Sequence, residues 1–335
     1  MEGAALALRL EAEAEAWSAP RDLEVIPVVE DDDLPVIDLG DYLSTDSESA
    51  LARVAEGVRD AGERVGFMFV VNHGLDECLE RGYEASRAFH EELSDDAKVP
   101  FADGSGFLRT ENYTLPKRDL PNFNESFVIK RELGPRNMTL EKVPWPKSKK
   151  FDSEKFEKRV RALIAAYEGL ALRLLPIYAR ALDLPLDYFD NLFSPSPVLR
   201  MRLASYATTP AQNFGINPHV DTSFFTLLAS TDFSGLVIYS KEKQSWLRAK
   251  NLPDHNHPLI VNTGQMLAQL TNDQWPATRH FAFNPTPTPR LSLPFFFNAD
   301  AQAPLAVLPS KCSDSNPPRY PTLSYLQSQA IQQGE

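Results

Sequence analysis

The sequence predicts a mainly β fold with flanking helices. From residue 197 onward, short apolar runs alternate with turn residues, a pattern typical of strands. Before that point, apolar side chains recur at three- and four-residue spacing over stretches long enough for helices. Several short strands at this spacing favour an antiparallel sandwich or barrel.

Helices and isolated strands are predicted in the first part of the chain. Short strands are expected at residues 35–39, 66–72 and 125–129. Helices are expected at 47–62, 75–93 and 153–182, and Pro176 should kink or end the last of them. Later strands are expected at 199–206, 224–229, 236–239, 259–262, 280–284 and 291–298.

The composition limits the classes of partner. The chain has 335 residues, and 34 Lys and Arg stand against 46 Asp and Glu, which gives a net charge of −12. This acidic balance argues against nucleic-acid binding. No uninterrupted run of about 18 apolar residues is present, so no membrane span is expected. Nothing in the sequence indicates an obligate protein partner, and a small-molecule substrate is expected.

The N-terminus and the cysteines indicate the compartment. Residues 4–17 are rich in Ala and Leu but contain Glu11, Glu13 and Glu15, which predicts an amphipathic surface helix and not a secretory signal. The two cysteines, Cys78 and Cys312, are too few for a disulfide scaffold. A cytoplasmic location is therefore expected.

Two histidines and one aspartate are candidate metal ligands. His219 and Asp221 stand at i and i+2, so they share one face if this segment is a strand. His280 opens a later apolar run. Two imidazoles and one carboxylate make the facial triad of non-haem Fe(II) oxygenases, which leaves positions open for a co-substrate and O₂. A single H-x-D pair is weak evidence, because a lone strand histidine is more often a hydrogen-bonded core residue.

Arg290 and Ser292 strengthen the metal interpretation. They follow His280 and share one face of a predicted strand. A guanidinium and a hydroxyl placed together can clamp a carboxylate. Burying Arg290 without an anion would be costly, and a dicarboxylate co-substrate would supply that anion.

Taken together, these motifs resemble the isopenicillin N synthase-like family of Fe(II)- and 2-oxoglutarate-dependent dioxygenases. The H-x-D pair, His280 and the R-x-S pair match the family motifs in order and approximate spacing. Further matching segments are residues 34–39, 65–67, 71–74, 124–127, 217–223, 226–228, 261–264, 294–298 and 319–321. The resemblance covers about residues 34–326, and its specificity lies in the combination of motifs.

The resemblance implies a fold and a cofactor set. The implied fold is a distorted double-stranded β-helix, or jelly-roll, with an iron site inside its open end. The implied cofactors are Fe(II) bound by His219, Asp221 and His280, 2-oxoglutarate as co-substrate, O₂, and ascorbate as a reductant. The implied reaction abstracts hydrogen from a C–H bond of a small, specialised-metabolite substrate. Hydroxylation, desaturation or ring formation follows, while 2-oxoglutarate becomes succinate and CO₂.

The resemblance also implies how 2-oxoglutarate is held. Its distal carboxylate would be bound by Arg290, Ser292 and Tyr206. Many relatives carry Asn two residues before this tyrosine, whereas this chain has Ala204, so that one polar contact departs from the family pattern.

The resemblance suggests boundaries and a substrate pocket. The boundaries are an N-terminal extension (1–33), an N-terminal dioxygenase region (34–150), a helical connection (151–196), the jelly-roll core (197–310) and a C-terminal tail (311–335). Candidate substrate-contacting residues are Phe123, Phe214, Phe224, Phe297 and Arg202. The identity of the substrate does not follow from the sequence.

Three alternatives remain open on the sequence alone. The nearest is an iron oxidase or cyclase of the same family that does not use 2-oxoglutarate. A zinc hydrolase could use a similar ligand set. A catalytically silent metabolite-binding protein is the third.

Overall fold

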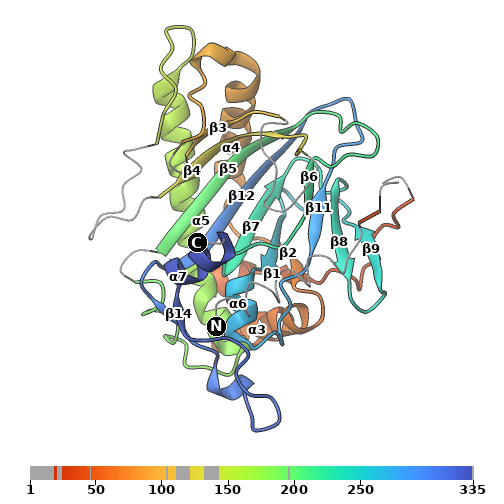
Figure 1. Cartoon of the computed structure of the whole chain (residues 1–335), viewed down its shortest axis with the longest axis vertical. Helices are drawn as coiled ribbons and strands as arrows, with labels where there is room; N and C mark the ends of the chain where they lie inside the picture. The colour runs from red at the N-terminus through yellow and green to blue at the C-terminus, as the bar shows by residue number, and fades with distance from the viewer. Residues whose placement is uncertain are drawn as a thin grey trace.

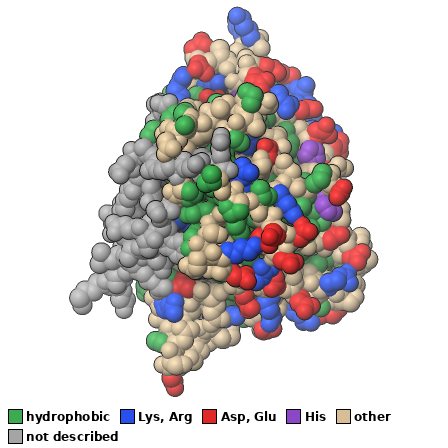
Figure 2. Space-filling view, turned by 90° about the vertical axis from the view of Figure 1, so that its right-hand side faces the viewer, with side chains coloured by type: hydrophobic (Ala, Val, Ile, Leu, Met, Phe, Trp, Pro, Cys, Tyr) green, Lys and Arg blue, Asp and Glu red, His purple; other side chains and the backbone are tan. Residues whose placement is uncertain are grey.

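The computed structural model shows two facing sheets with helices packed against one of them (Figure 1). The structure describes residues 19–20, 25–45, 47–102, 105–110, 121–131, 143–194 and 197–333. The helix predicted at residues 4–17 lies outside this range. Figure 2 shows acidic and basic side chains interspersed over one face of the molecule, without a continuous area of one sign among the described side chains.

Among the described residues, eight strands form a major sheet in the order β1-β2-β10-β7-β12-β5-β4-β3. Their bounds are β1 Val36–Asp38, β2 Phe67–Val71, β3 Gly106–Leu108, β4 Glu125–Lys130, β5 Pro197–Tyr206, β7 Phe225–Ser230, β10 Leu259–Thr263 and β12 Arg290–Asp300. β1 and β2 run parallel, and the other neighbours pair antiparallel. The strands that precede residue 197 therefore extend the same sheet as the core strands.

The minor sheet faces the major one and has the order β6-β11-β8-β9. Its bounds are β6 Ile216–His219, β8 Leu236–Ser240, β9 Ser245–Arg248 and β11 His280–Ala282, and β13 Pro304–Leu305 pairs separately with β14 Leu323–Ser324. The two facing sheets confirm the predicted jelly-roll class. No closed barrel forms in the part of the chain that the structure describes.

Helices cover the outer side of the major sheet (Figure 1). The described α-helices are α2 Gly40–Thr45, α3 Glu48–Arg64, α4 Asp76–Arg87, α5 Ser153–Ala181, α6 Gln265–Leu270 and α7 Tyr325–Gln333, of which α3, α4 and α5 pack on this sheet. Side chains cap two of them at the positions where the helical pattern begins. Ser47 Oγ accepts from Ala50 N at 3.2 Å, and Asp152 Oδ1 accepts from Lys155 N at 3.0 Å. After Arg87 the chain continues as one π-helical turn, Ala88–Glu92.

Pro176 does not end α5, so that part of the expectation is wrong, and a kink at the proline stays a prediction. The helix continues to Ala181, and Leu174, Leu175 and Ile177 around the proline are all buried. Tertiary packing of this apolar stripe outweighs the lost backbone hydrogen bond. By length and composition α5 could also cross a membrane, a test that a buried core helix passes as well. Here its apolar face packs on the major sheet.

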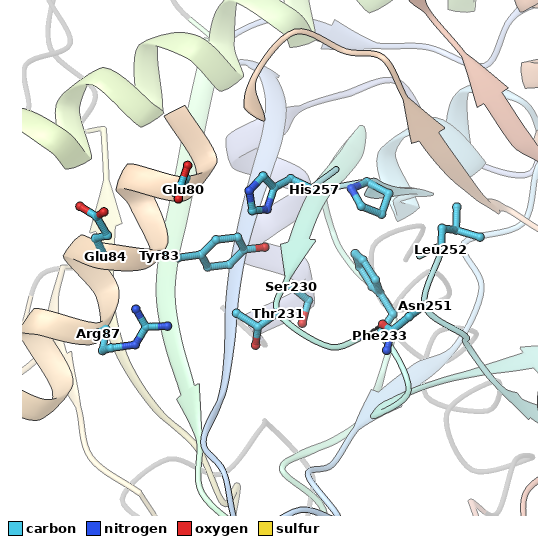
Figure 3. A pocket seen from close by; sticks show the side chains of 11 residues that line it. Glu80, Tyr83, Glu84, Arg87, Ser230, Thr231, Phe233, Asn251, Leu252 and His257 are labelled. Atoms are coloured by element: carbon cyan, nitrogen blue, oxygen red, sulfur yellow. Dashed lines mark hydrogen bonds between the residues drawn. The ribbon is translucent and has the colours of Figure 1, made fainter. Parts of the chain in front are cut away.

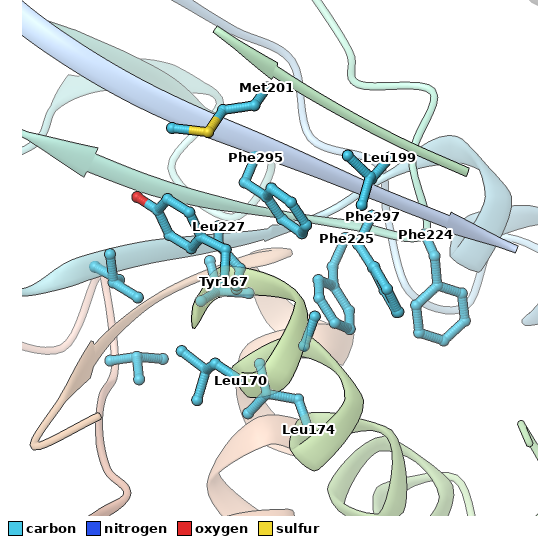
Figure 4. Packing of buried hydrophobic residues seen from close by; sticks show 14 of the residues in the cluster. Tyr167, Leu170, Leu174, Leu199, Met201, Phe224, Phe225, Leu227, Phe295 and Phe297 are labelled. Carbon is cyan, nitrogen blue, oxygen red and sulfur yellow. The ribbon is translucent and has the colours of Figure 1, made fainter. Parts of the chain in front are cut away.

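The core lies between α5 and the major sheet (Figure 4). Phe225 and Leu227 of β7 and Phe295 and Phe297 of β12 stand at alternate positions and all face the helices. The ring of Tyr167 stacks on Phe295 with 5.2 Å between ring centroids, and its hydroxyl donates to the carbonyl of Leu293 at 3.0 Å. We call this side of the major sheet the helix-side face.

The opposite side of the major sheet, here called the interior face, looks towards the minor sheet. Ala204 and Tyr206 of β5 cluster there with Ile216 of β6 and Ala282 of β11. Phe67 of β2 also crosses the gap, and its ring lies 5.2 Å from that of His280. Strand alternation therefore divides the chain between an apolar helix-side core and a more polar interior.

Replacing Phe297 with Ala should destabilise the fold by about 3–5 kcal/mol, because the ring is fully buried and stacks on Phe193 at 4.7 Å. The shift in the midpoint of chemical denaturation measures this cost. Phe101→Ala is the control, since that ring is 40% exposed and its loss should change stability by less than about 0.5 kcal/mol. Equal shifts in the two variants would contradict the assignment of Phe297 to the core.

Candidate metal centre

Three polar side chains from separate segments meet between the sheets. His219 ends β6, Asp221 follows the strand, and His280 opens β11 directly opposite His219. Asp221 Oδ1 lies 3.6 Å from His219 Nε2 and 3.8 Å from His280 Nε2. One ligand atom from each residue lies within 4.8 Å of the other two, so the three can share one metal ion. The predicted triad is therefore brought together.

Backbone carbonyls orient both imidazoles. His219 Nδ1 lies 2.7 Å from the carbonyl oxygen of Asn217, and His280 Nδ1 lies 3.1 Å from that of Thr278. A carbonyl can only accept a hydrogen bond, so each Nδ1 carries a proton and donates. The lone pair of each Nε2 is then directed at the Asp221 side, as in metal-binding histidines.

The second oxygen of Asp221 is held by two buried side chains. Thr226 Oγ1 of β7 donates to Oδ2 at 2.6 Å, and Asn262 Nδ2 of β10 donates at 2.8 Å. These bonds turn Oδ1 towards the two imidazoles. Neither residue was assigned a role from the sequence, although a polar side chain inside an apolar strand is a signal that could have identified both.

Burial and charge set the protonation of the triad. Burial acts to raise the pKa of Asp221, but the nearby His280 and His219 outweigh it and hold that pKa well below its usual range. Burial, followed by the His219 charge, lowers the pKa of His280 to about 4. At neutral pH the site therefore offers a carboxylate and a neutral imidazole, which are suitable ligands for a divalent cation.

A buried guanidinium lies on the interior face of the major sheet. Arg290 is 3% exposed and stands opposite Tyr206 in the β12–β5 register. Its Nε donates to the carbonyl of Asp232, and its Cζ lies 5.1 Å from the Tyr206 ring centroid. Burial lowers the pKa of Arg290, whereas Tyr206 and Asp232 raise it, and a guanidinium remains charged at neutral pH.

Arg290 retains an unused donor that fits an anionic ligand. Its Nη1 is buried and has no hydrogen-bond partner among the described residues. Leaving such a donor unpaired is costly, so the position indicates a carboxylate. Ser292 follows on the same face at i+2, and its backbone stands opposite Ala204. The triad thus fits a ferrous ion, and Arg290 with Ser292 fits the distal carboxylate of 2-oxoglutarate.

A pocket beside α4 and the end of β7 lies outside the triad. It measures about 460 Å³ and contains none of the triad residues, Arg290 or Ser292. Figure 3 shows Tyr83 of α4 pointing into it towards His257, whose ring lies 5.7 Å from that of Tyr83. The donor chemistry, and not the size of the cavity, therefore locates the metal centre.

Three predicted substrate contacts are wrong. Phe224 and Phe297 are fully buried on the helix-side face, where their rings pack on Phe193. Phe214 packs against Phe281 on the outer side of the minor sheet, since Phe281 alternates with the inward-facing His280. Strand alternation turns Phe297 away from the interior, whereas Phe224 and Phe214 precede β7 and β6 and are turned away by their packing.

The other two predicted substrate contacts are Phe123 and Arg202. Phe123 is half-buried, and its backbone N–H donates to the carbonyl of Phe214 beside β6. Arg202 is half-buried on β5 at an even-numbered position, like Ala204 and Tyr206 of the interior face. Both remain predictions.

The other histidines in the described part of the chain stand outside the triad. His73 Nε2 contacts the carbonyl of His257 at 2.9 Å, and its Nδ1 accepts from Leu75 N at 3.0 Å. The side chain of His90 on the π-helical turn is 4% exposed. It contacts Glu125 Oε1 at 2.5 Å and the carbonyl of Leu203 at 3.1 Å, because the π-helical turn directs it against β4 and β5.

Two family models match the chain in adjacent regions. Residues 34–148 match the N-terminal region described as a non-haem dioxygenase in morphine synthesis. Residues 195–299 match the 2OG-Fe(II) oxygenase superfamily. The second match contains all three triad residues together with Arg290 and Ser292.

Curated relatives agree with the family models. The chain is 26% identical over 285 residues to the 2-oxoglutarate-dependent dioxygenase citB of Monascus ruber, covering 80% of this chain and 85% of the relative. It is 27% identical over 309 residues to the 2-oxoglutarate-Fe(II) type oxidoreductase hxnY of Emericella nidulans, covering 87% and 86%.

Solved structures show the same fold. A full-length Neurospora crassa protein solved in complex with alpha-KG superposes with a TM-score of 0.77 at 20% identity, covering 91% of this chain and 97% of that one. JOX2 in complex with 2OG, Fe and JA gives a TM-score of 0.73 at 23% identity, covering 96% and 93%.

Replacing Thr226 with Val should weaken Fe(II) binding by about 10- to 100-fold, because Asp221 Oδ2 loses a donor that orients the carboxylate. Anaerobic titration calorimetry with Fe(II) measures the change. Thr45→Val is the matched control, since the Thr45 hydroxyl bonds only exposed neighbours far from the triad, donating to the carbonyl of Asp41 and accepting from Ser47 N. Unchanged affinity in Thr226→Val would show that Thr226 does not position the ligand.

Proposed function

Because this chain belongs to the 2OG-Fe(II) oxygenase superfamily and is an Fe(II)- and 2-oxoglutarate-dependent dioxygenase, we propose that it oxidises a C–H bond of a small, specialised-metabolite substrate. Hydroxylation, desaturation and ring formation are the outcomes that this chemistry allows. The observation that carries the proposal is the convergence of His219, Asp221 and His280 in one sandwich interior with the buried Arg290. Family membership rules out the zinc hydrolase and the silent binding protein.

The chain's own residues would hold and orient the reactants. The triad binds Fe(II), which supplies O₂ activation when bound. We propose that Arg290 and Ser292 bind the distal carboxylate of 2-oxoglutarate, with Tyr206 beside them. The guanidinium is rigid because its Nε is fixed by Asp232 and its face rests on the Tyr206 ring. This fixed clamp sets the position of the co-substrate relative to the metal.

The apolar lining of the interior would exclude water. Phe67 and Phe69 of β2, together with Ile260 of β10, are buried on this side of the major sheet. Water exclusion protects a reactive oxidant from side reactions and strengthens the electrostatic contacts in the site. Phe67 lies against the His280 ring and therefore also limits its rotation.

Succinate formation separates this function from the oxidase or cyclase alternative. Purified protein with Fe(II), ascorbate, O₂ and 2-oxoglutarate should release succinate and CO₂ as it oxidises members of a natural-product panel. Asp221→Ala should abolish this turnover, since the metal loses its carboxylate ligand, while circular dichroism verifies the fold. Substrate oxidation with no succinate would favour the alternative, and turnover retained in Asp221→Ala would contradict the ligand assignment.

Replacing Arg290 with Lys should raise the KM for 2-oxoglutarate by about 10- to 100-fold. Lysine keeps the charge but loses the planar pair of donors that grips a carboxylate. Initial rates of succinate formation at varied 2-oxoglutarate measure the effect. Arg53→Lys is the control, because Arg53 is an exposed α3 residue that pairs with Asp41. A KM equal to that of the wild type would place the carboxylate elsewhere.

A further inference from the structure

We propose that the pocket beside α4 is a second ligand site, which binds a small monocarboxylate through Arg87 and Tyr83. This pocket, here called the α4 pocket, lies outside the metal centre, and no step of the proposed oxidation uses it. It measures about 460 Å³, which is within the usual range for small-molecule sites. One wall comes from α4, and the opposite wall comes from residues 230–233 and 251–258 (Figure 3).

One stripe of α4 forms the first wall. Its pocket-lining residues recur at three- and four-residue spacing, which places them on one side of the helix: Glu80, Tyr83, Glu84 and Arg87. Figure 3 shows Tyr83 and Arg87 pointing from this helix towards the end of β7. The two residues stand at i and i+4, so they are neighbours on the helix surface and one ligand group can contact both.

Arg87 is a cation without a partner in the part of the chain that the structure describes. It is exposed, and neither a hydrogen bond nor an ion pair joins it to a described residue. Other arginines nearby are engaged, since Arg159 of α5 pairs with Glu84 at 2.7 Å and Arg81 pairs with Glu77. The Arg87 guanidinium is therefore available to the carboxylate of a ligand.

The hydroxyl of Tyr83 is a buried donor without an acceptor. Tyr83 is 6% exposed, and its hydroxyl has no hydrogen-bond partner among the described residues. Burial raises the pKa of Tyr83, and the charge of Arg290 opposes that rise only in part, so the hydroxyl is protonated at neutral pH. Leaving a buried donor unpaired is costly, so this position indicates a ligand with an acceptor oxygen.

Hydrogen bonds hold the opposite wall in place. Leu291 N donates to Thr231 Oγ1 at 3.0 Å, and Thr231 N donates to the carbonyl of Leu291 at 3.0 Å. Asn251 Oδ1 accepts from Phe233 N at 2.8 Å, which ties the two segments of this wall together. The wall therefore has a defined shape against which a ligand can pack.

Apolar side chains of the same wall would contact the body of the ligand. Phe233, Leu252 and Pro258 line the α4 pocket, and the ring of His257 lies 5.7 Å from that of Tyr83. Apolar and aromatic surface beside a few polar groups is typical of small-molecule sites. The expected ligand therefore joins its carboxylate to an aromatic or aliphatic group.

Glu80 favours a ligand with a single negative charge. It is exposed, has no partner among the described residues, and lines the α4 pocket seven residues before Arg87. That spacing corresponds to about 10 Å along a helix. A second carboxylate at this end would meet a like charge, which is unfavourable. Dicarboxylates such as succinate and 2-oxoglutarate are therefore expected to bind the α4 pocket poorly.

Matched acid and amide pairs test the inference. Benzoate, cinnamate and octanoate are titrated by calorimetry into anaerobic full-length protein holding Fe(II) and saturating 2-oxoglutarate, alongside benzamide, cinnamamide and octanamide. At least one acid should bind about 10-fold or more tightly than its amide, because only the acid forms a charge-assisted pair with Arg87. Succinate should give no binding heat under these conditions.

Three variants locate the binding. Arg87→Gln changes an exposed side chain and should bring the acid-to-amide ratio close to one. Arg81→Gln is the matched control, since Arg81 lies on the same helix outside the α4 pocket, and it should keep the ratio. Tyr83→Phe removes only an unpartnered hydroxyl, so it should not lower the midpoint of chemical denaturation, yet it should weaken acid binding several-fold.

A wild-type ratio near one for every pair overturns the inference, and so does a ratio that survives in Arg87→Gln. A ratio that is lost in Arg290→Lys but kept in Arg87→Gln would place the acid at the co-substrate clamp and would also overturn it. Binding of succinate as tight as that of the acids would contradict the preference for a single charge. The calorimetric readout does not depend on succinate formation, which tests the proposed function separately.

Discussion

The two-residue alternation of the major sheet is the constraint on which the rest of the molecule depends. Each central strand sends one set of side chains into the helix-side core and the other set towards the minor sheet. On β12, Phe295 and Phe297 fill the core while Arg290 and Ser292 face inward. A shift of one residue in the register would reverse these roles and bury the guanidinium against α5.

Neighbouring residues hold all three metal ligands in place. The Asn217 and Thr278 carbonyls set the proton on each imidazole, and the bonds from Thr226 and Asn262 fix the carboxylate. These partners come from several strands of both sheets, so the geometry is available only when the sandwich is complete. Such support fixes the orientation of the side chains that would bind the metal.

The arginines of β5 and β12 differ in how deeply they are buried. Arg290 lies deep and fully buried, whereas Arg200 is exposed at the other end of the β5–β12 pair. The triad, held largely by the minor sheet, faces the β5–β12 pair across the sandwich.

The chemical identity of the site could be predicted from the sequence. His219, Asp221 and His280 are the ligand types that ferrous iron requires, and the R-x-S pair supplies a carboxylate clamp, whatever their distance apart along the chain. Strand and helix positions also followed from apolar periodicity, which depends on local spacing alone. Residue type therefore indicated the kind of ligand, and local spacing indicated the secondary structure.

Only the tertiary structure decided which way each side chain points. Periodicity shows that residues alternate, but it does not show which set faces the helices, and so Phe297 was misplaced. Phe214 and Phe224 precede their strands, and only tertiary packing shows where their rings lie. The supporting roles of Thr226 and Asn262 depend on strands that become neighbours only in the folded sheet. Pro176 likewise stays within α5 because the buried face of the helix packs on the rest of the core. This tertiary stabilisation cannot be inferred from the helix sequence alone.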